Sequence, residues 1–176
     1  RPGHTRATVT GGDTALLTLT YGDAATIRVA NLGLRRRKTG PDKADGFWVD
    51  TLTGRWLSDK AGTATVGTPM DELDDQGNIT SKARVIPFVE DSRNILITRL
   101  ADTSDDDVTM SLRYALERGI EAEFQLEDSE LASQTLPDSG GHGRTLFMEA
   151  NEGGAGMLRR IVDEPDAIAR VARRAL

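Results

Sequence analysis

Apolar and β-branched residues gather in short runs along the front part of the chain, and such runs are typical of strands. Six runs are predicted to be strands: 5–10, 14–20, 25–30, 46–49, 83–89 and 94–100. Gly11-Gly12-Asp13 and Tyr21-Gly22-Asp23 separate the first three as turns. Glu90-Asp91-Ser92-Arg93 lies between the last two, which we expect to pair. Residues 58–82 show no clear period and predict a loop.

The pattern changes to a helical period after Asp107. Apolar residues recur at every fourth position from Val108 to Phe124 and predict one face of a helix, which Gly119 would kink or break. The acidic stretch 102–107 suits the positive end of a helix dipole. The remaining segments are an ambiguous run at 126–136, a predicted strand at 144–150, and predicted helices at 156–162 and 165–176.

Strands at the front and helices at the back, without strict alternation, predict an α+β fold with a mixed or antiparallel sheet. The chain of 176 residues fits one compact unit. Within it we expect a β-rich part over 1–90 and an α+β part with a glycine-rich loop over 91–176. The chain begins Arg1-Pro2-Gly3 without an initiating methionine, so we expect it to be a piece of a longer or processed protein.

Composition excludes several kinds of chemistry. The chain has no cysteine and two histidines, so disulfides, thiolate catalysis, iron–sulfur clusters, thiolate zinc sites and all-histidine metal sites are excluded. There is no membrane-spanning stretch and no signal peptide, so we expect a cytoplasmic location and no membrane partner. The net charge of −6 divides into +4 over 1–60, −11 over 61–150 and +1 over 151–176. A nucleic-acid contact would therefore use the first or last part.

A glycine-rich loop after the strand at 144–150 is the most informative feature. Gly153, Gly154 and Gly156 lie between an apolar run and an amphipathic segment, which predicts strand, loop and helix. The simpler interpretation is a tight turn, in which glycine permits unusual backbone angles. The functional interpretation is a backbone pocket for a phosphate. The spacing matches neither a P-loop nor a dinucleotide-binding fingerprint.

Two carboxylates flank this loop. Glu149 and Glu152 could act as acid and base or bind a divalent ion. Alternatively, Glu152 is a charge partner of the helix N-terminus, and Glu149 points to solvent or pairs with an arginine such as Arg113. Strand alternation would place Glu149 on the same face as Phe147. No set of nucleophile, base and orienting group is evident, so we predict no catalytic residue and no metal site.

Two basic clusters could contact phosphates. The stronger is Arg35, Arg36, Arg37 and Lys38, near which Trp48 or Trp56 could stack on a base. The second is Arg159 and Arg160, just beyond the glycine loop. The alternative for the first cluster is a solvated surface run.

The second half of the chain resembles a known domain. The resemblance is carried by the segments Asn94-Ile95-Leu96-Ile97, Ser111-Leu112-Arg113-Tyr114-Ala115-Leu116, Phe124, Glu130-Leu131, Leu146-Phe147-Met148-Glu149-Ala150 and Glu152-Gly153-Gly154-Ala155-Gly156-Met157-Leu158. It resembles a C-terminal domain of unknown function in superfamily 2 DNA helicases, of the DISARM phage-defence and mitomycin-repair types. Many members of that family carry four zinc-binding cysteines, which this chain lacks.

The resemblance implies a non-catalytic accessory domain of an ATP-dependent DNA translocase, possessing no helicase motifs of its own. It would brace the motor domains, contact DNA or dock a partner subunit, in a phage-defence setting among others. ATP and Mg²⁺ would belong to the parent helicase, and this chain would bind no cofactor. Two alternatives stay open: a protein-docking scaffold, favoured by the acidic middle, and a hydrolase that uses Glu149 and Glu152.

Overall fold

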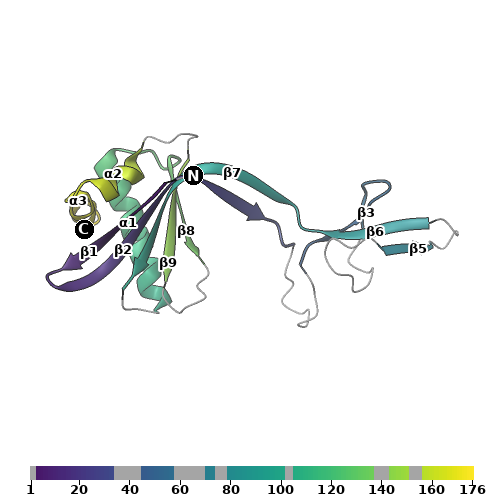
Figure 1. The fold of residues 1–176 in the computed structure, drawn as a ribbon, viewed down its shortest axis with the longest axis horizontal. Helices are drawn as coiled ribbons and strands as arrows, with labels where there is room; N and C mark the ends of the chain where they lie inside the picture. The colour runs from purple at the N-terminus through teal and green to yellow at the C-terminus, as the bar shows by residue number, and fades with distance from the viewer. Residues whose placement is uncertain are drawn as a thin grey trace. The chain divides into compact units, whose positions relative to one another are not determined.

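The computed structural model describes residues 3–33, 45–57, 70–73, 79–101, 105–136, 143–150 and 156–176 (Figure 1). The chain divides into two compact units, one of residues 1–27 with 91–176 and one of residues 28–90. This division differs from the sequence-based parts 1–90 and 91–176. Residues 1–27 belong with the C-terminal part because their strands lie in the same sheet as the C-terminal strands.

The first unit is built on a five-stranded sheet. Its strands are β1 (His4–Gly11), β2 (Thr14–Ala30), β7 (Phe88–Leu100), β9 (Arg144–Glu149) and β8 (Leu131–Leu136), in that spatial order. The pairings of β1 with β2, of β7 with β9 and of β8 with β9 are antiparallel. The predicted α+β class is confirmed, with its helices in the C-terminal half.

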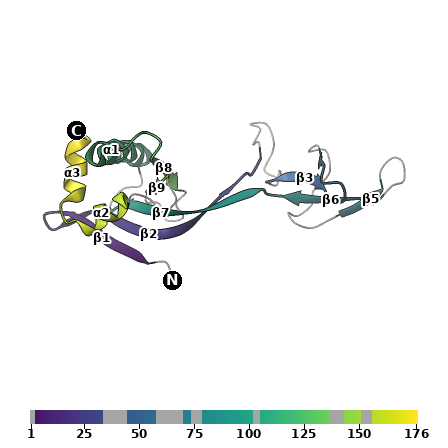
Figure 2. The same cartoon turned by 90° about the horizontal axis from the view of Figure 1, so that it is seen from above.

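Three helices accompany this sheet: α1 (Asp106–Phe124), α2 (Met157–Asp163) and α3 (Ala167–Arg174). Figure 2 shows α1 and α3 on the same side of the sheet. The buried core of this unit joins apolar side chains of all three helices and of four strands: Leu17, Leu19, Tyr21, Leu96, Leu116, Ile120, Leu131, Phe147, Met157, Leu158, Ile161 and Val171. Burial of this apolar area is the main stabilising contribution to such a fold.

Helix α1 confirms part of the predicted face. Leu116 and Ile120 are buried, whereas Val108 is exposed and Thr109 is buried beside it in sequence. Gly119 does not break the helix, which runs unbroken through it. The side chain of Asp105 accepts hydrogen bonds from the backbone N–H groups of Asp107 and Val108, so the acidic stretch caps the helix as expected.

The turn predicted at 21–23 and the pairing predicted between 83–89 and 94–100 are both wrong. Strand β2 continues through Tyr21-Gly22-Asp23, and β7 continues through residues 90–93. Glycine suits position 22 of this strand because a Cβ there would lie only 3.1 Å from the Ile95 side chain, which is closer than an ordinary packing contact. The irregularity expected of a turn is confined to Ala24, which has a φ of 47° and donates its backbone N–H to the Asn94 side chain. Tertiary contacts therefore override the local turn signal.

The second unit has a four-stranded sheet in the order β4-β3-β6-β5. Its strands are β3 (Phe47–Asp50), β4 (Trp56–Leu57), β5 (Met70–Leu73) and β6 (Ile79–Val85), and all their pairings are antiparallel. The loop predicted over 58–82 is wrong in part, because β5 and the first part of β6 lie within this range. Trp48 and Arg84 are both buried, and the guanidinium of Arg84 lies 5.6 Å from the Trp48 ring centroid.

Candidate functional site

Glu149 ends strand β9 and is almost fully buried, with 1% of its surface exposed. Phe147, two residues earlier, is buried as well, whereas Met148 between them is half-buried. The predicted alternation of Phe147 and Glu149 onto one face is therefore consistent with the burial of the strand. A carboxylate at a buried position requires hydrogen-bond partners, because an unpaired buried charge is strongly unfavourable.

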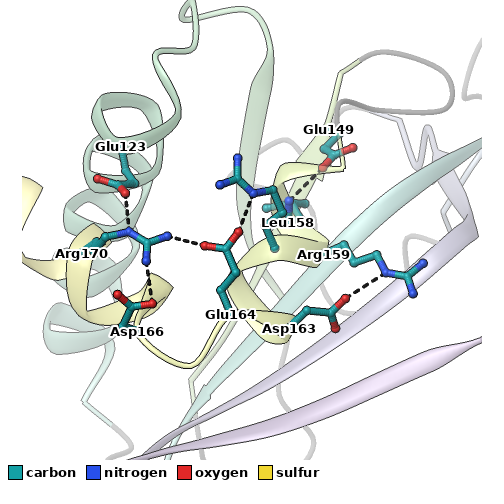
Figure 3. Close-up of polar contacts among 9 residues, drawn as sticks. Glu123, Glu149, Leu158, Arg159, Asp163, Glu164, Asp166 and Arg170 are labelled. Atoms are coloured by element: carbon teal, nitrogen blue, oxygen red, sulfur yellow. Dashed lines mark hydrogen bonds and ion pairs between the residues drawn. The ribbon is translucent and has the colours of Figure 1, made fainter.

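The Glu149 carboxylate accepts three hydrogen bonds. The backbone N–H of Leu158 donates to Oε1 at 2.9 Å, and that of Gly156 donates to Oε2 at 3.3 Å. The side-chain amide of Asn94 donates to Oε2 at 3.2 Å. Figure 3 shows the carboxylate facing the first turn of α2. Glu149 thus satisfies backbone donors that a helix N-terminus otherwise leaves without partners.

Asn94 extends this arrangement into the sheet. Its amide nitrogen donates to Glu149, and its side-chain oxygen accepts the backbone N–H of Ala24 at 3.2 Å. One amide side chain on β7 therefore connects the irregular position in β2 with the end of β9, and through Glu149 with α2. We refer to Asn94, Glu149 and the N–H groups of Gly156 and Leu158 as the Glu149 network. Asn94 was not predicted from the sequence, although a buried amide within an apolar strand is a signal that could have identified it.

The alternative in which Glu149 points to solvent or pairs with Arg113 is wrong. Glu149 is buried and bonded to the network, whereas Arg113 lies on α1 with its guanidinium 4.4 Å from the Tyr114 ring centroid. The structure brings Glu149 and Gly156 together, while Glu152, Gly153 and Gly154 lie outside the described residues. The basic cluster Arg35, Arg36, Arg37 and Lys38 also lies outside them.

The chemistry open to this network is that of an internal brace. A carboxylate already occupies the donors to which a phosphate would bind, and a second anion there would meet charge repulsion. Tyr21 lies close enough to respond to the same charge. Burial is the main cause that raises the pKa of the Tyr21 hydroxyl, and the negative charges of Asp23 and Glu149 add to it. Tyr21 therefore stays protonated and donates to Asp23.

Arg159 and Arg160 are engaged within the first unit. Arg159 forms an ion pair with Asp163 at 3.1 Å, and Arg160 forms one with Glu164 at 2.7 Å. The guanidinium of Arg160 also lies 5.1 Å from the ring centroid of Phe124. Both side chains are more than half exposed, so they remain reachable from solvent. Any phosphate contact would compete with these acidic partners.

Arg170 on α3 joins the three helices through carboxylates. It binds Glu123 on α1 at 2.6 Å, Asp166 before α3 at 2.7 Å, and Glu164 at the end of α2 (Figure 3). The hydrogen bond from Arg170 is the main cause that lowers the pKa of Glu123 and of Asp166. For Glu164 the main cause of the lowered pKa is Arg160, followed by Arg170.

Acidification is expected to weaken this helix cluster. Carboxylates whose pKa is lowered in the folded state stabilise it above their unfolded pKa, about 4. That contribution is lost as the pH falls through the lower, folded pKa. Urea unfolding of the wild type and of Arg170→Met between neutral pH and about pH 3 measures it. We expect Arg170→Met to be less stable at neutral pH and the difference to narrow in acid; equal acid sensitivity of both proteins would contradict this assignment.

Two further properties concern the described residues alone. No helix among them is long and apolar enough to cross a membrane. In the same part of the chain, no three histidine, aspartate or glutamate side chains gather where they could hold a metal ion.

Comparison with known proteins finds few matches. No family model matches the chain, and no curated protein does. Among solved structures, the chain is similar to the crystal structure of the DUF1998 helicase MrfA bound to DNA, with 8% identity over 97% of this chain and a TM-score of 0.47. The chain spans 19% of the length of that protein. A similarity this low assigns neither a family nor a role to this chain, and the function proposed below rests on the residues of the chain itself.

Proposed function

We propose that this chain is a non-catalytic accessory domain of an ATP-dependent superfamily 2 DNA helicase, in which it braces the motor domains and contacts the DNA backbone. The observation that carries the proposal is the Glu149 network. Asn94, Glu149, Gly156 and Leu158 come from three of the separate segments that carry the resemblance to helicase-associated domains, and they meet in one set of hydrogen bonds. Residues that a family of domains shares for structural reasons would be expected to meet in one such network.

The network supports a structural role of Glu149 inside this chain rather than a catalytic one. A general acid or base must reach the substrate, whereas the Glu149 carboxylate is buried and already accepts three hydrogen bonds. ATP and Mg²⁺ would be bound by motor domains outside this chain. A phage-defence or DNA-repair helicase is the parent protein that the resemblance favours.

The DNA contact is assigned to the basic cluster Arg35, Arg36, Arg37 and Lys38. The other candidate cations, Arg159 and Arg160, already have carboxylate partners, and the first turn of α2 is occupied by Glu149. Four adjacent cations would release condensed counterions from a nucleic-acid strand, which makes the affinity dependent on salt.

Neutralising this cluster is expected to weaken DNA binding. Fluorescence anisotropy with labelled single-stranded and duplex DNA across a salt series measures the affinity of the full chain and of a variant with all four residues changed to glutamine. We expect the slope of log affinity against log salt to fall by about 3 for single strands.

A matched control removes four exposed cations of the first unit, Arg6, Arg99, Arg118 and Arg173, by the same change to glutamine. It removes the same net charge from elsewhere and is expected to lower the slope much less. If both variants lower the slope equally, the affinity depends on the total charge of the chain and not on a contact at residues 35–38. Failure of the wild type to bind DNA at low salt would contradict the DNA role and favour a docking scaffold.

A further inference from the structure

The two tryptophans of the second unit have opposite surroundings. Trp48 on β3 is 2% exposed and lies against Arg84, so it is part of the interior of its unit. Trp56 on β4 is 63% exposed. Tryptophan is highly buried in most folded proteins, because its large ring gains much from leaving water. An exposed ring of this size on a short hairpin offers a flat apolar face on which a ligand can stack.

The Trp56 ring is held in a defined orientation. Phe47 of β3 packs against it edge to face, with ring centroids 5.6 Å apart and an interplanar angle of 73°. This contact covers the ring at one place and leaves most of its surface in solvent. A ring whose orientation is fixed before binding loses less conformational entropy when a ligand stacks on it.

The turn that carries Trp56 is closed by Asp50. One oxygen of the Asp50 carboxylate accepts the backbone N–H of Leu52 at 2.9 Å, and the other accepts the Thr53 hydroxyl at 2.7 Å. The backbone N–H of Asp50 donates to the carbonyl of Arg55, and its own carbonyl accepts the N–H of Gly54. The carboxylate and carbonyl oxygens of Asp50 thus accept hydrogen bonds within the turn. Arg55 and Trp56, which are adjacent in sequence at the end of this turn, are both exposed.

The charge of the second unit is compatible with an anionic ligand such as a nucleic acid. Residues 28–90 carry ten basic and nine acidic side chains, a net charge of +1, whereas the rest of the chain carries a net charge of −7. The hairpin therefore belongs to the unit that a polyanion would approach with less repulsion.

We propose that Trp56 is a stacking platform for an unpaired base of single-stranded DNA, with Arg55 beside it as a contact for the neighbouring phosphate. This inference rests on the proposed function, because DNA is the ligand in both, and it specifies the form of DNA. Bases of a duplex are already stacked on their neighbours and paired, so a single exposed ring offers them little. An unpaired base presents a free face to the ring, whatever its sequence.

The test is fluorescence anisotropy of the full chain with a labelled oligothymidylate and with a labelled duplex. Trp56→Ala is expected to weaken single-strand binding by about 5- to 100-fold, in line with the loss of one stacked base. Trp56→Phe retains an aromatic face and should retain most of the affinity. Leu52→Ala is the matched control, because Leu52 is 68% exposed on the same hairpin but has no aromatic face. Circular dichroism checks that the variants fold alike.

The outcomes separate this inference from the proposed function. If the wild type binds single strands in a salt-dependent manner but Trp56→Ala binds equally well, the stacking platform is wrong and the DNA role stands. An equal loss in Leu52→Ala and Trp56→Ala would overturn the platform, because the loss of DNA affinity would then not depend on an aromatic face. Equal losses on single strands and duplex would overturn the preference for unpaired bases. If the wild type binds no DNA, both proposals fail.

Discussion

Replacing Glu149 by alanine is expected to lower the free energy of unfolding of the first unit by about 3–5 kcal/mol. The change removes the acceptor for the backbone N–H groups of Gly156 and Leu158 and for the side-chain amide of Asn94. Buried donors without an acceptor lose the hydrogen bonds that they would make to water in the unfolded chain. Since whole domains are stable by only about 5–15 kcal/mol, this single change would bring the unit close to unfolding at ambient temperature.

Urea unfolding followed by circular dichroism measures this effect, and Glu90→Ala provides the control. Glu90 is also a strand glutamate, but it is exposed and forms a surface ion pair with Arg28 at 2.6 Å. Its loss should cost less than about 1 kcal/mol. A similar small cost for Glu149→Ala would show that the network does not brace α2. It would also reopen the interpretation of Glu149 as a group held ready for catalysis.

Replacing Gly119 by alanine is expected to destabilise the protein by roughly 2–3 kcal/mol, although the same change stabilises most helices. The reason is the close approach of α1 to α3. A Cβ at Gly119 would fall well inside van der Waals contact with the backbone carbonyl oxygen of Val171. Backbone cannot rotate away as a flexible side chain does, so α3 would have to move, and the fully buried Val171 side chain with it.

Thermal unfolding of Gly119→Ala and of Ser111→Ala compares the two effects on one helix. Ser111 is exposed on α1, so its replacement by a better helix former should leave the stability unchanged or slightly raised. A gain in stability for Gly119→Ala as well would contradict the close packing of the two helices. A loss for Gly119→Ala alone is the expected result.

The fold class could be predicted from the sequence because local patterns and tertiary structure agree in the second half. The four-residue period before Phe124, the aspartates before α1 and the apolar run of β9 all act within a few residues of one another. Each element therefore carries its own signal. The same agreement placed Phe147 and Glu149 on one buried face.

The turn predicted at 21–23 is wrong for the opposite reason. Gly22 and Asp23 resemble turn residues locally, but the environment of Gly22 and of the neighbouring Ala24 is set by Ile95 and Asn94, about seventy positions away in the chain. The division into units has a similar origin, because the pairing that attaches residues 1–27 to the C-terminal sheet is long-range. The hydrophobic period of a segment indicates whether it is a helix or a strand, but it does not indicate which strands are neighbours in the sheet.

The surroundings of the candidate residues could not be predicted from the sequence. The sequence drew attention to Glu149 beside the glycine loop, but it did not predict that this carboxylate is buried and bonded to α2 and Asn94. The decisive partners are backbone N–H groups of α2, which have no sequence signature, and the Asn94 amide, whose only signal is its place in an otherwise apolar strand. The exposed Trp56 could likewise not be distinguished from the buried Trp48 by sequence, since both lie in short apolar strands.

The most direct test of the account is an amide chemical-shift titration of the isotope-labelled full chain with single-stranded DNA. The account predicts saturable shifts at residues 35–38 and at the backbone and indole N–H of Trp56. It predicts no shift at Gly156 and Leu158, whose N–H groups already bind Glu149. Shifts centred on Gly156 and Leu158 would contradict the brace and make the glycine loop a phosphate site, and a spectrum unchanged by DNA would contradict the DNA contact altogether.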